Sequence, residues 1–263
     1  MSGNQEKILN QYGDGTREAV RSKRSRTSSL EFHYTKKHLD GFITKESRVL
    51  EVGCAAGYYG LYYADKCKEY VGIDICPPHI ELFEQKIAES GLDNVSCRIG
   101  DAINLDGIAD ESFDIVLCLG PMYHLPTEER ELVFIECSRV CKREGVLAFA
   151  YINKIGVYAG ACVYYEPGRY PNDIANDCII NRGTDDLKPD LLFFTVPEKI
   201  EAMAAKHGLA RIKNLGTDFF ITMKVVDDMT NEQFEVMKPL YDQMTSHESC
   251  TGMSNHALLL CRK

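Results

Sequence analysis

Apolar and polar residues form two patterns along the chain, short apolar runs and longer stretches in which apolar residues recur at helical spacing. The short runs, which predict strands, cover residues 48–52, 69–74, 95–99, 113–119, 145–152, 209–225 and 256–261. Helical spacing covers residues 58–66, 80–90, 127–140, 197–207 and 229–244. Strands that alternate with helices at short spacing are typical of a parallel sheet with helices on both faces. The pattern therefore predicts an α/β fold around a mostly parallel, seven-stranded sheet, with the nearly continuous apolar run 113–119 as a central strand.

Two segments break this rhythm. Residues 1–45 predict helices, interrupted at Gly13-Asp14-Gly15. Residues 153–193 are rich in Gly and Pro, and their tyrosines are Tyr158, Tyr164, Tyr165 and Tyr170. A structureless loop of that length is uncommon in a compact domain, and the aromatic residues favour an ordered lid. We therefore expect an N-terminal helical cap over residues 1–45 and one domain over residues 46–263, with residues 153–193 as a lid insertion after the fifth strand.

Composition narrows the class of protein. The chain has 263 residues, of which 44% are hydrophobic and 26% charged, values that are ordinary for a globular protein with a sizeable core. No apolar stretch approaches the roughly 20 residues that span a bilayer, and the opening MSGNQEKILNQ lacks the apolar region of a secretory signal. We therefore expect a cytoplasmic protein. The formal net charge of -9 argues against a nucleic-acid partner, because nucleic-acid binding needs Lys and Arg to replace counterions.

A basic run near the N-terminus is the local exception to this acidic balance. Its members are Arg17, Arg21, Lys23, Arg24 and Arg26. Charge runs are commonly a solvated helix face. The alternative is a basic lip that attracts an anionic substrate or the carboxylate of a cofactor.

The 11 cysteines do not predict a metal site. They are scattered, no Cys-x-x-Cys pair occurs, and Cys137 and Cys141 supply at most half of a site. We expect free thiols in a reduced interior, where Cys packs as a small core residue.

Candidate chemistry gathers where the first three predicted strands end. Glu51-Val52-Gly53-Cys54-Ala55-Ala56-Gly57 follows the first strand, and its glycines permit a tight turn whose backbone N–H groups approach a ligand beside a helix N-terminus. Asp74 closes the second strand, where an acid typically accepts hydrogen bonds from ribose hydroxyls. Gly100-Asp101-Ala102 follows the third strand, and its carboxylate can accept from an adenine amino group. Together these strand ends predict a site for a nucleotide-like cofactor.

These motifs, and the order in which they follow one another along the chain, resemble those of class I S-adenosylmethionine (SAM) methyltransferases. The motifs that carry the resemblance are Glu51-x-Gly53-x-Ala55-x-Gly57, Gly72-Ile73-Asp74, Gly100-Asp101-Ala102, Phe113-Asp114-Ile115-Val116 and Gly145-Val146-Leu147. A bacterial branch of that family, with Gly-Pro-x-Tyr-His after the fourth strand, is matched at residues 119–125, and further by residues 31–35 and 252–256. The resemblance covers nearly the whole chain and implies a Rossmann-like, doubly wound sheet. It also implies that the protein converts SAM to S-adenosylhomocysteine (SAH).

The resemblance implies a role for each matched residue. Gly53, Cys54, Ala55 and Gly57 would pass beside the methionine part of SAM, and Glu51 would orient that loop, often through the amino group. Asp74 would bind the ribose and Ile75 would pack on the adenine, whose edge Asp101 and Ala102 would frame. Leu119 and Gly120 would present backbone near the sulfonium, and Tyr34 and Thr35 would also contact the cofactor.

Methyl transfer from a sulfonium mainly requires that an acceptor be aligned and water excluded. An oxygen or nitrogen acceptor also loses a proton, and His suits that transfer near neutral pH. Tyr123 and His124, which follow the fourth strand, are the first candidates for a catalytic role. His256 and His33 are further candidates, and for any one of these histidines a structural role stays open.

The identity of the methyl acceptor is only partly constrained. The motif at 119–124 differs from the Asn/Asp-Pro-Pro-aromatic type that resembles amino-group methylases of nucleic acids, so we expect a small-molecule acceptor, with a protein side chain next. Residues 153–193 would set that choice. Two other functions stay open, a dinucleotide-dependent oxidoreductase, whose fingerprint would need Gly at 55 and 58, and a SAM-binding sensor or assembly protein without transferase activity.

Overall fold

The computed structural model describes the chain except for residues 1–2, 14–17, 19 and 221–222. Its centre is a seven-stranded sheet in the order β3-β2-β1-β4-β5-β7-β6. The strands are β1 (Arg48–Val52), β2 (Glu69–Asp74), β3 (Val95–Ile99), β4 (Phe113–Cys118), β5 (Cys141–Ile152), β6 (Ala210–Gly216) and β7 (His256–Arg262). The first five pair in parallel, and β7 runs antiparallel between β5 and β6. The sheet confirms the expected mostly parallel, seven-stranded α/β fold.

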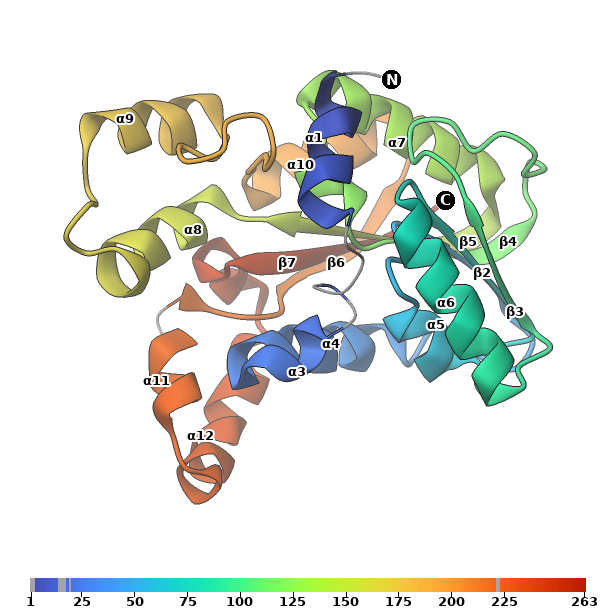
Figure 1. The fold of residues 1–263 in the computed structure, drawn as a ribbon, viewed down its shortest axis with the longest axis horizontal. Helices are drawn as coiled ribbons and strands as arrows, with labels where there is room; N and C mark the ends of the chain where they lie inside the picture. Colours follow the sequence, from blue (N-terminus) through green and yellow to red (C-terminus); the bar gives the residue numbers. More distant parts are fainter. Residues whose placement is uncertain (1–2, 14–17, 19, 221–222) are drawn as a thin grey trace.

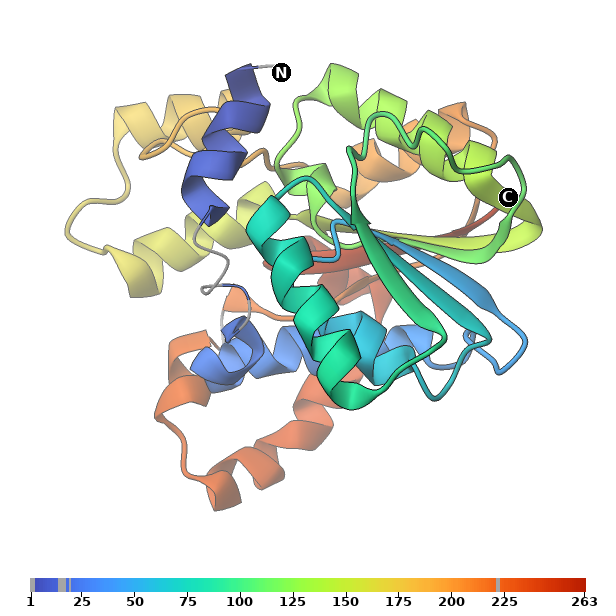
Figure 2. The same ribbon diagram turned by 45° about the vertical axis from the view of Figure 1, so that its right-hand side comes forward.

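The central strand shows why the apolar pattern was informative. Successive side chains of a strand point to opposite faces, and in β4 Ile115 and Leu117 belong to one core while Val116 and Cys118 belong to the other. Helices α7 (Thr127–Val140) and α10 (Pro197–Lys206) cover the second face, and α5 (Tyr58–Tyr63) and α6 (Pro77–Ser90) the first. Figures 1 and 2 show these two layers of helices around the sheet.

The N-terminal residues divide into two parts. Helix α4 (Arg26–Leu39) places Phe32 and Leu39 in the same core as β1 and α6, so it belongs to the body of the domain. Helix α1 (Gly3–Tyr12) lies instead beside the loops that follow β2 and β3, since Gln5 contacts Asp101 and the Tyr12 carbonyl accepts from the Cys76 thiol. The short α3 (Arg21–Arg24) precedes α4. Helices α1 and α3 therefore lie at the strand-end loops, whereas α4 packs in the body of the domain.

The insertion at residues 153–193 is ordered and mostly helical. Helices α8 (Lys154–Gly160) and α9 (Asp173–Ala175) each continue into a π-helical turn, Ala161–Tyr165 and Asn176–Arg182 respectively. They enclose a small core of their own with Ile152, Tyr170 and Phe194. Figure 1 shows this segment as a yellow arm beside the sheet.

The expectation of one strand over residues 209–225 is wrong. Strand β6 ends at Gly216, and α11 (Met223–Asp228) and α12 (Asn231–Met244) follow before β7. The apolar run misled because Phe219 leaves the sheet and packs with Tyr34 and Tyr241 in a separate cluster. That cluster joins α12 to α4. No helix among the described residues is both long and apolar enough to cross a membrane.

Candidate functional site

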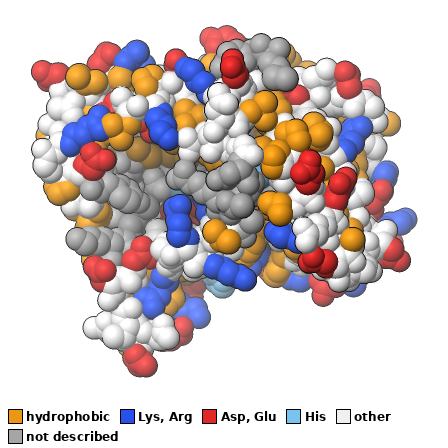
Figure 3. All heavy atoms as spheres, in the orientation of Figure 1, with side chains coloured by type: hydrophobic (Ala, Val, Ile, Leu, Met, Phe, Trp, Pro, Cys, Tyr) orange, Lys and Arg blue, Asp and Glu red, His pale blue; other side chains and the backbone are white. Residues whose placement is uncertain are grey.

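A cavity of about 720 Å³ lies at the carboxyl ends of the parallel strands, beneath α1. It brings together most of the residues that the sequence singled out, namely Glu51, Gly53, Cys54, Ala55, Asp74, Ile75, Asp101, Ala102, Leu119, Gly120, Tyr123 and His124. Ligands of open α/β sheets typically bind at this edge. On the face drawn in Figure 3, Lys and Arg side chains are interspersed with acidic and hydrophobic ones.

The turn after β1 is held close to β2 and β4. The N–H groups of Gly53 and Cys54 both donate to the carbonyl of Ile73, at 2.7 and 3.0 Å. Gly53 has a φ of 79°, and a Cβ there would lie 2.5 Å from Cδ of Pro121. Gly57 also has a φ of 79°, but a Cβ there would lie 2.0 Å from the Phe83 ring, and this glycine does not line the cavity. Gly57 therefore serves packing, whereas Gly53 shapes the wall of the site.

Asp74 joins the glycine-rich turn to the end of β2. Its Oδ2 accepts from the Ala55 N–H at 2.8 Å, and its Oδ1 accepts from the Cys76 N–H at 2.9 Å and lies 3.3 Å from Nδ1 of His79. His79 was not selected from the sequence, because a lone His in a helix is usually structural. A carboxylate offers about four acceptor positions. Asp74 can therefore still accept a hydrogen bond from a ligand hydroxyl.

Glu51 is a buried acid at the centre of the cavity wall, 1% exposed. Its Oε2 accepts from the hydroxyl of Tyr70 at 2.7 Å. Burial raises the pKa of Glu51 to about 8, with a further upward contribution from Asp74 and an opposing one from the Tyr70 hydrogen bond. A cationic ligand group in the cavity would reverse part of this shift, because it stabilises the charged carboxylate.

The carboxylate of Asp101 already accepts a hydrogen bond from a side-chain amide. Nε2 of Gln5, on α1, donates to its Oδ2, and the N–H of Ile103 donates to its Oδ1 at 3.2 Å. The NH₂ group of a Gln amide has the same donor chemistry as the exocyclic amino group of adenine. The contact therefore shows that this carboxylate is placed to accept from such a group.

Tyr123 and His124 line the cavity, but each is engaged. Nδ1 of His124 lies 3.0 Å from the carbonyl of Leu191 and Nε2 lies 3.3 Å from the hydroxyl of Tyr12, so the proton sits on Nδ1 and Nε2 accepts. Burial lowers the pKa of His124 to about 4, although the Leu191 carbonyl opposes the shift. The Tyr123 hydroxyl donates to the carbonyl of Leu119 at 3.2 Å, and burial raises its pKa. Neither group is therefore well placed as a proton acceptor.

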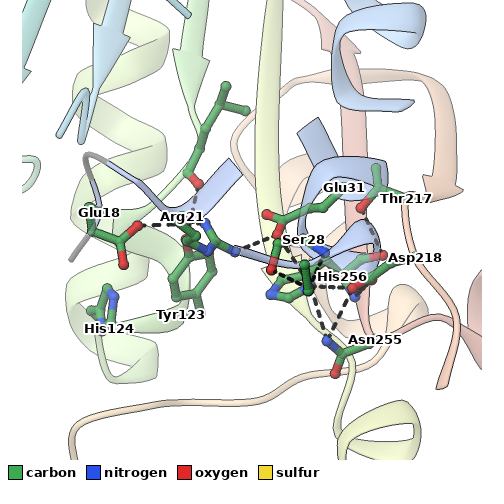
Figure 4. Close-up of polar contacts among 12 residues, drawn as sticks. Glu18, Arg21, Ser28, Glu31, Tyr123, His124, Thr217, Asp218, Asn255 and His256 are labelled. Carbon is green, nitrogen blue, oxygen red and sulfur yellow. Dashed lines mark hydrogen bonds and ion pairs between the residues drawn. The ribbon is translucent and has the colours of Figure 1, made fainter. Parts of the chain in front are cut away.

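A second polar cluster borders the cavity where β7 begins (Figure 4). Nδ1 of His256 lies 2.9 Å from Oδ2 of Asp218, and the His256 N–H donates to Oδ1 of Asp218 at 2.6 Å. Oε2 of Glu31 lies 3.8 Å from the same Nδ1 and pairs with the guanidinium of Arg21. The sequence drew attention to His256, Arg21 and, within a motif, Glu31. Asp218 was missed, because nothing in its local pattern separates it from an ordinary loop acid.

The basic run divides between two environments. Arg21, Lys23 and Arg24 line the cavity, as the basic-lip interpretation requires. Arg26 instead donates to the carbonyls of Val226 and Met229, at 2.6 and 2.7 Å. Arg17 lies outside the described residues.

Several candidates lie away from the cavity. Tyr34 is fully buried, its ring stacks on Tyr241 and its hydroxyl donates to Asp242 at 3.1 Å, while Thr35 is buried against Tyr59. These positions correct the prediction that Tyr34 and Thr35 contact the cofactor, because the helix that carries them turns their side chains into the core. His33 is exposed outside the cavity.

Of the insertion's tyrosines, Tyr158, Tyr164 and Tyr170 do not line the cavity either. Tyr158 and Tyr170 meet edge to face at 6.1 Å, and Tyr170 lies in the insertion's own core. The insertion contributes Leu192 to the cavity wall. No group of three or more His, Cys, Asp or Glu side chains suited to a metal ion occurs in the part of the chain that the structure describes.

Comparisons with known proteins show which proteins this chain is similar to. Residues 50–149 match a family model described as a methyltransferase domain. The uncharacterized methyltransferase YcgJ of Bacillus subtilis is 33% identical over 100 residues, 38% of this chain and 38% of that protein. A ubiquinone biosynthesis O-methyltransferase of Stutzerimonas stutzeri is 28% identical over 164 residues, 62% of this chain and 64% of that protein. The chain therefore spans less than two thirds of the length of these curated relatives.

A solved structure extends the similarity to the fold of the whole chain. Magnesium protoporphyrin IX methyltransferase from Synechocystis, solved with bound SAH, superposes with a TM-score of 0.61 over 99% of both chains at 14% identity. Residues 50–149 therefore match a methyltransferase domain, and the superposition confirms the expected Rossmann-like fold of the chain. The matched residues 50–149 include the turn after β1, Asp74 and Asp101, but not Arg21, Glu31, Asp218 or His256. The chemistry of that second cluster must be inferred from its own geometry.

Proposed function

We propose that this chain, with its methyltransferase domain, binds SAM in the cavity and transfers the methyl group to an oxygen or nitrogen atom of a small molecule. The observation that carries the proposal is the series of acids at three successive strand ends. Glu51, Asp74 and Asp101 all line one cavity beside a glycine-rich turn. As a further part of the proposal, residues 120–124 assign the chain to the bacterial branch with Gly-Pro-x-Tyr-His.

The residues present fit this cofactor. Asp101 accepts from a primary amide of α1, which is the hydrogen bond that an adenine amino group would make. The pKa of the buried Glu51 is raised, and no described cationic side chain opposes that rise. A ligand ammonium or sulfonium would stabilise the charged form of Glu51. Glycine at position 53 lets the turn after β1 approach Pro121 closely, since a Cβ there would lie 2.5 Å from Cδ of Pro121.

The roles of these residues follow from their positions. Bound SAM supplies a methyl group already activated as a sulfonium. Glu51 holds the amino group, Asp74 accepts from the ribose hydroxyls, and Asp101 accepts from the adenine. Leu119 and Gly120, at the end of β4, bound the part of the cavity between the cofactor half and the second polar cluster. Phe32, Tyr59 and Leu192 limit the access of water.

A small-molecule acceptor is favoured by the size and charge of the site. A cavity of about 720 Å³ is within the usual range for small-molecule ligands. The mixed charge on the face in Figure 3 does not offer the continuous basic surface that nucleic acid requires. Methylation of tRNA, with no small molecule accepted, would contradict this part of the proposal.

Calorimetric titration of the purified protein with SAH, with NAD as the control ligand, tests the donor. We expect micromolar binding of SAH and none of NAD. Asp74→Asn should weaken SAH binding at least tenfold, since it replaces the charged acceptor, whereas the exposed Asp93→Asn should leave it unchanged. Binding of NAD instead would favour the oxidoreductase. Tight SAH binding without transfer to any acceptor would favour a sensor.

A further inference from the structure

His256 stands where the acceptor half of the cavity meets the end of the sheet. It begins β7 and pairs in register with Ile152, the last residue of β5, and both residues line the cavity. The acids that hold the cofactor in the proposed function lie near the carboxyl ends of β1, β2 and β3, on the other half of the sheet. A side chain at the β5–β7 end is therefore on the acceptor's side of the cavity.

The tautomer of this imidazole is fixed by its partners. Nδ1 of His256 lies 2.9 Å from Oδ2 of Asp218 and 3.0 Å from the amide nitrogen of Asn255. The Asn255 amide also donates to Oδ2 of Asp218 at 3.4 Å, and a carboxylate can only accept, so the shorter contact places the proton on Nδ1. The backbone N–H of His256 donates to the other oxygen of Asp218, so the two residues are held together at two points. No hydrogen bond engages Nε2 among the residues that the structure describes. Nε2 is therefore the atom that can accept a proton from a ligand.

The charged groups around the ring favour this function. They are Asp218 after β6, Glu31 on α4 and Arg21 on α3, and Tyr123 lies across the cavity with its ring centre 6.4 Å away. Burial opposes protonation of His256, but Asp218 and Glu31 outweigh it, so its pKa is raised, whereas that of His124 falls to about 4. His256 is therefore a stronger base than His124, the other histidine of the matched motifs that lines the cavity.

The described charged groups of the cluster are mainly acidic. Arg21 pairs with Glu31 and lies 3.8 Å from Glu18, and Asp218 contacts His256. With His256 neutral, as a base must be, three acids face one cation, so the cluster disfavours an anionic acceptor. The rings of Phe32, Tyr58 and Tyr59 line the same cavity, and the Arg21 guanidinium stacks 5.3 Å over Phe32. These surroundings suit a neutral molecule with an aromatic frame.

We propose that His256, oriented by Asp218, is the general base of the methyl transfer and that the acceptor is a phenolic hydroxyl of a neutral aromatic molecule. The inference rests on the proposed function. The hydroxyl oxygen forms its bond to the methyl carbon as the methyl–sulfur bond breaks, the sulfur keeps that electron pair, and the hydroxyl proton moves to Nε2 of His256 and then to water. A phenol has a pKa of about 10, close enough to that of imidazole for this transfer, whereas an aliphatic alcohol is far weaker as an acid.

The first test measures the proton without any turnover. Histidine ring signals of the SAH-bound protein are followed by NMR against pH and assigned with His256→Ala. We expect His256 to carry its proton on Nδ1 when neutral and to titrate above the ordinary His pKa of about 6.5. Asp218→Asn should lower that pKa, because it removes the adjacent negative charge. A proton on Nε2 in the neutral form, or a pKa that Asp218→Asn leaves unchanged, would overturn the assignment.

The second test measures transfer from SAM to phenol, 4-methylphenol and catechol and to the matched amines aniline, 4-methylaniline and 1,2-diaminobenzene. We expect methylation of the hydroxyl probes, with kcat reduced at least about a hundredfold in His256→Ala. His256→Gln, which keeps more of the volume, and the exposed control His33→Ala accompany it. The pH at which kcat/KM levels off should match the NMR pKa of His256 and move down with it in Asp218→Asn.

The outcomes separate this inference from the function on which it rests. Absence of SAH binding in the wild type would contradict the proposed function itself. Normal SAH binding with undiminished kcat in both His256 variants would contradict the general base alone. Transfer to the amines only, or to none of the six probes, would overturn the acceptor class.

Discussion

The side-chain amide of Gln5, on α1, donates a hydrogen bond to the carboxylate of Asp101 at the end of β3. The two residues are far apart in the sequence, and the contact places α1 over the end of the cavity that the proposed function assigns to adenine. Lys7 extends from the same helix to Asp190 at 3.3 Å, and Gln11 accepts from Lys188 at 2.8 Å. Binding of a nucleoside at Asp101 must therefore exchange the Gln5 contact for a new one.

The first prediction concerns that exchange. Gln5→Ala removes a competing donor, so SAH should bind about three- to tenfold more tightly, which corresponds to ~0.7–1.4 kcal/mol, the range of a typical net hydrogen bond. Lys7→Ala is the matched control, since it alters the same helix at an exposed ion pair outside the cavity. Calorimetry with SAH provides the measurement. Weaker binding in Gln5→Ala would mean instead that Gln5 contacts the ligand.

The second prediction concerns the protonation of Glu51. Its pKa of about 8 means that the carboxyl is mostly protonated at neutral pH, and a bound cationic group would draw the proton off. SAM affinity should therefore rise as the pH increases from 6 towards 8, by up to about tenfold per pH unit, with release of a proton on binding. Calorimetry in buffers of different ionisation enthalpy measures that proton. Glu51→Gln should bind more weakly and lose the pH dependence; an unchanged slope would refute the role of Glu51.

A third prediction separates two glycines with left-handed backbone. Gly57 and Gly91 have φ values of 79° and 63°, but a Cβ at Gly57 would lie 2.0 Å from Phe83, whereas one at Gly91 would meet nothing within 4 Å. Gly57→Ala should therefore destabilise the protein by about 2–5 kcal/mol, as the sum of backbone strain and overpacking. Gly91→Ala should cost only the strain, about 1–2 kcal/mol. Urea unfolding of the two variants measures the difference, and equal losses would show that the Phe83 contact is relieved cheaply.

The fourth prediction concerns His124 and stability in acid. Burial lowers the pKa of His124 from 6.5 to about 4. Between these two pH values the unfolded chain therefore binds a proton at His124 and the folded chain does not. Its contribution to stability is therefore present above pH 6.5 and is lost as the pH falls towards 4. His124→Gln should flatten this part of the curve of unfolding free energy against pH. The exposed His247→Gln serves as the control, and identical curves for wild type and His124→Gln would contradict the assignment.

Local pattern was enough to predict the parallel part of the sheet and to select strand-end residues that the structure brings to one cavity. Strand β4 is buried on both faces, and the run Phe113–Leu119 indicates that directly, because its positions other than the half-buried Asp114 are buried and apolar. Asp74 ends β2 and Asp101 follows β3, and parallel strands present their carboxyl ends at one edge. The local sequence pattern was therefore sufficient to predict these features without knowledge of any long-range contact.

The acceptor half depended on contacts that no local pattern records. Asp218 and His256 meet because β6 and β7 pair antiparallel and a turn after Gly216 brings the acid to the start of β7. Tyr34 looked as available as Phe32 in the same helix, and only the docking of α12, with Tyr241 against Tyr34, turned it into the core. Helix periodicity specifies which residues share a face, but the partner of that face is set by the free energy of packing between distant segments. For this reason the strand-end residues proposed to hold the cofactor could be selected from the sequence, whereas the base proposed for the acceptor became evident only from the folded chain.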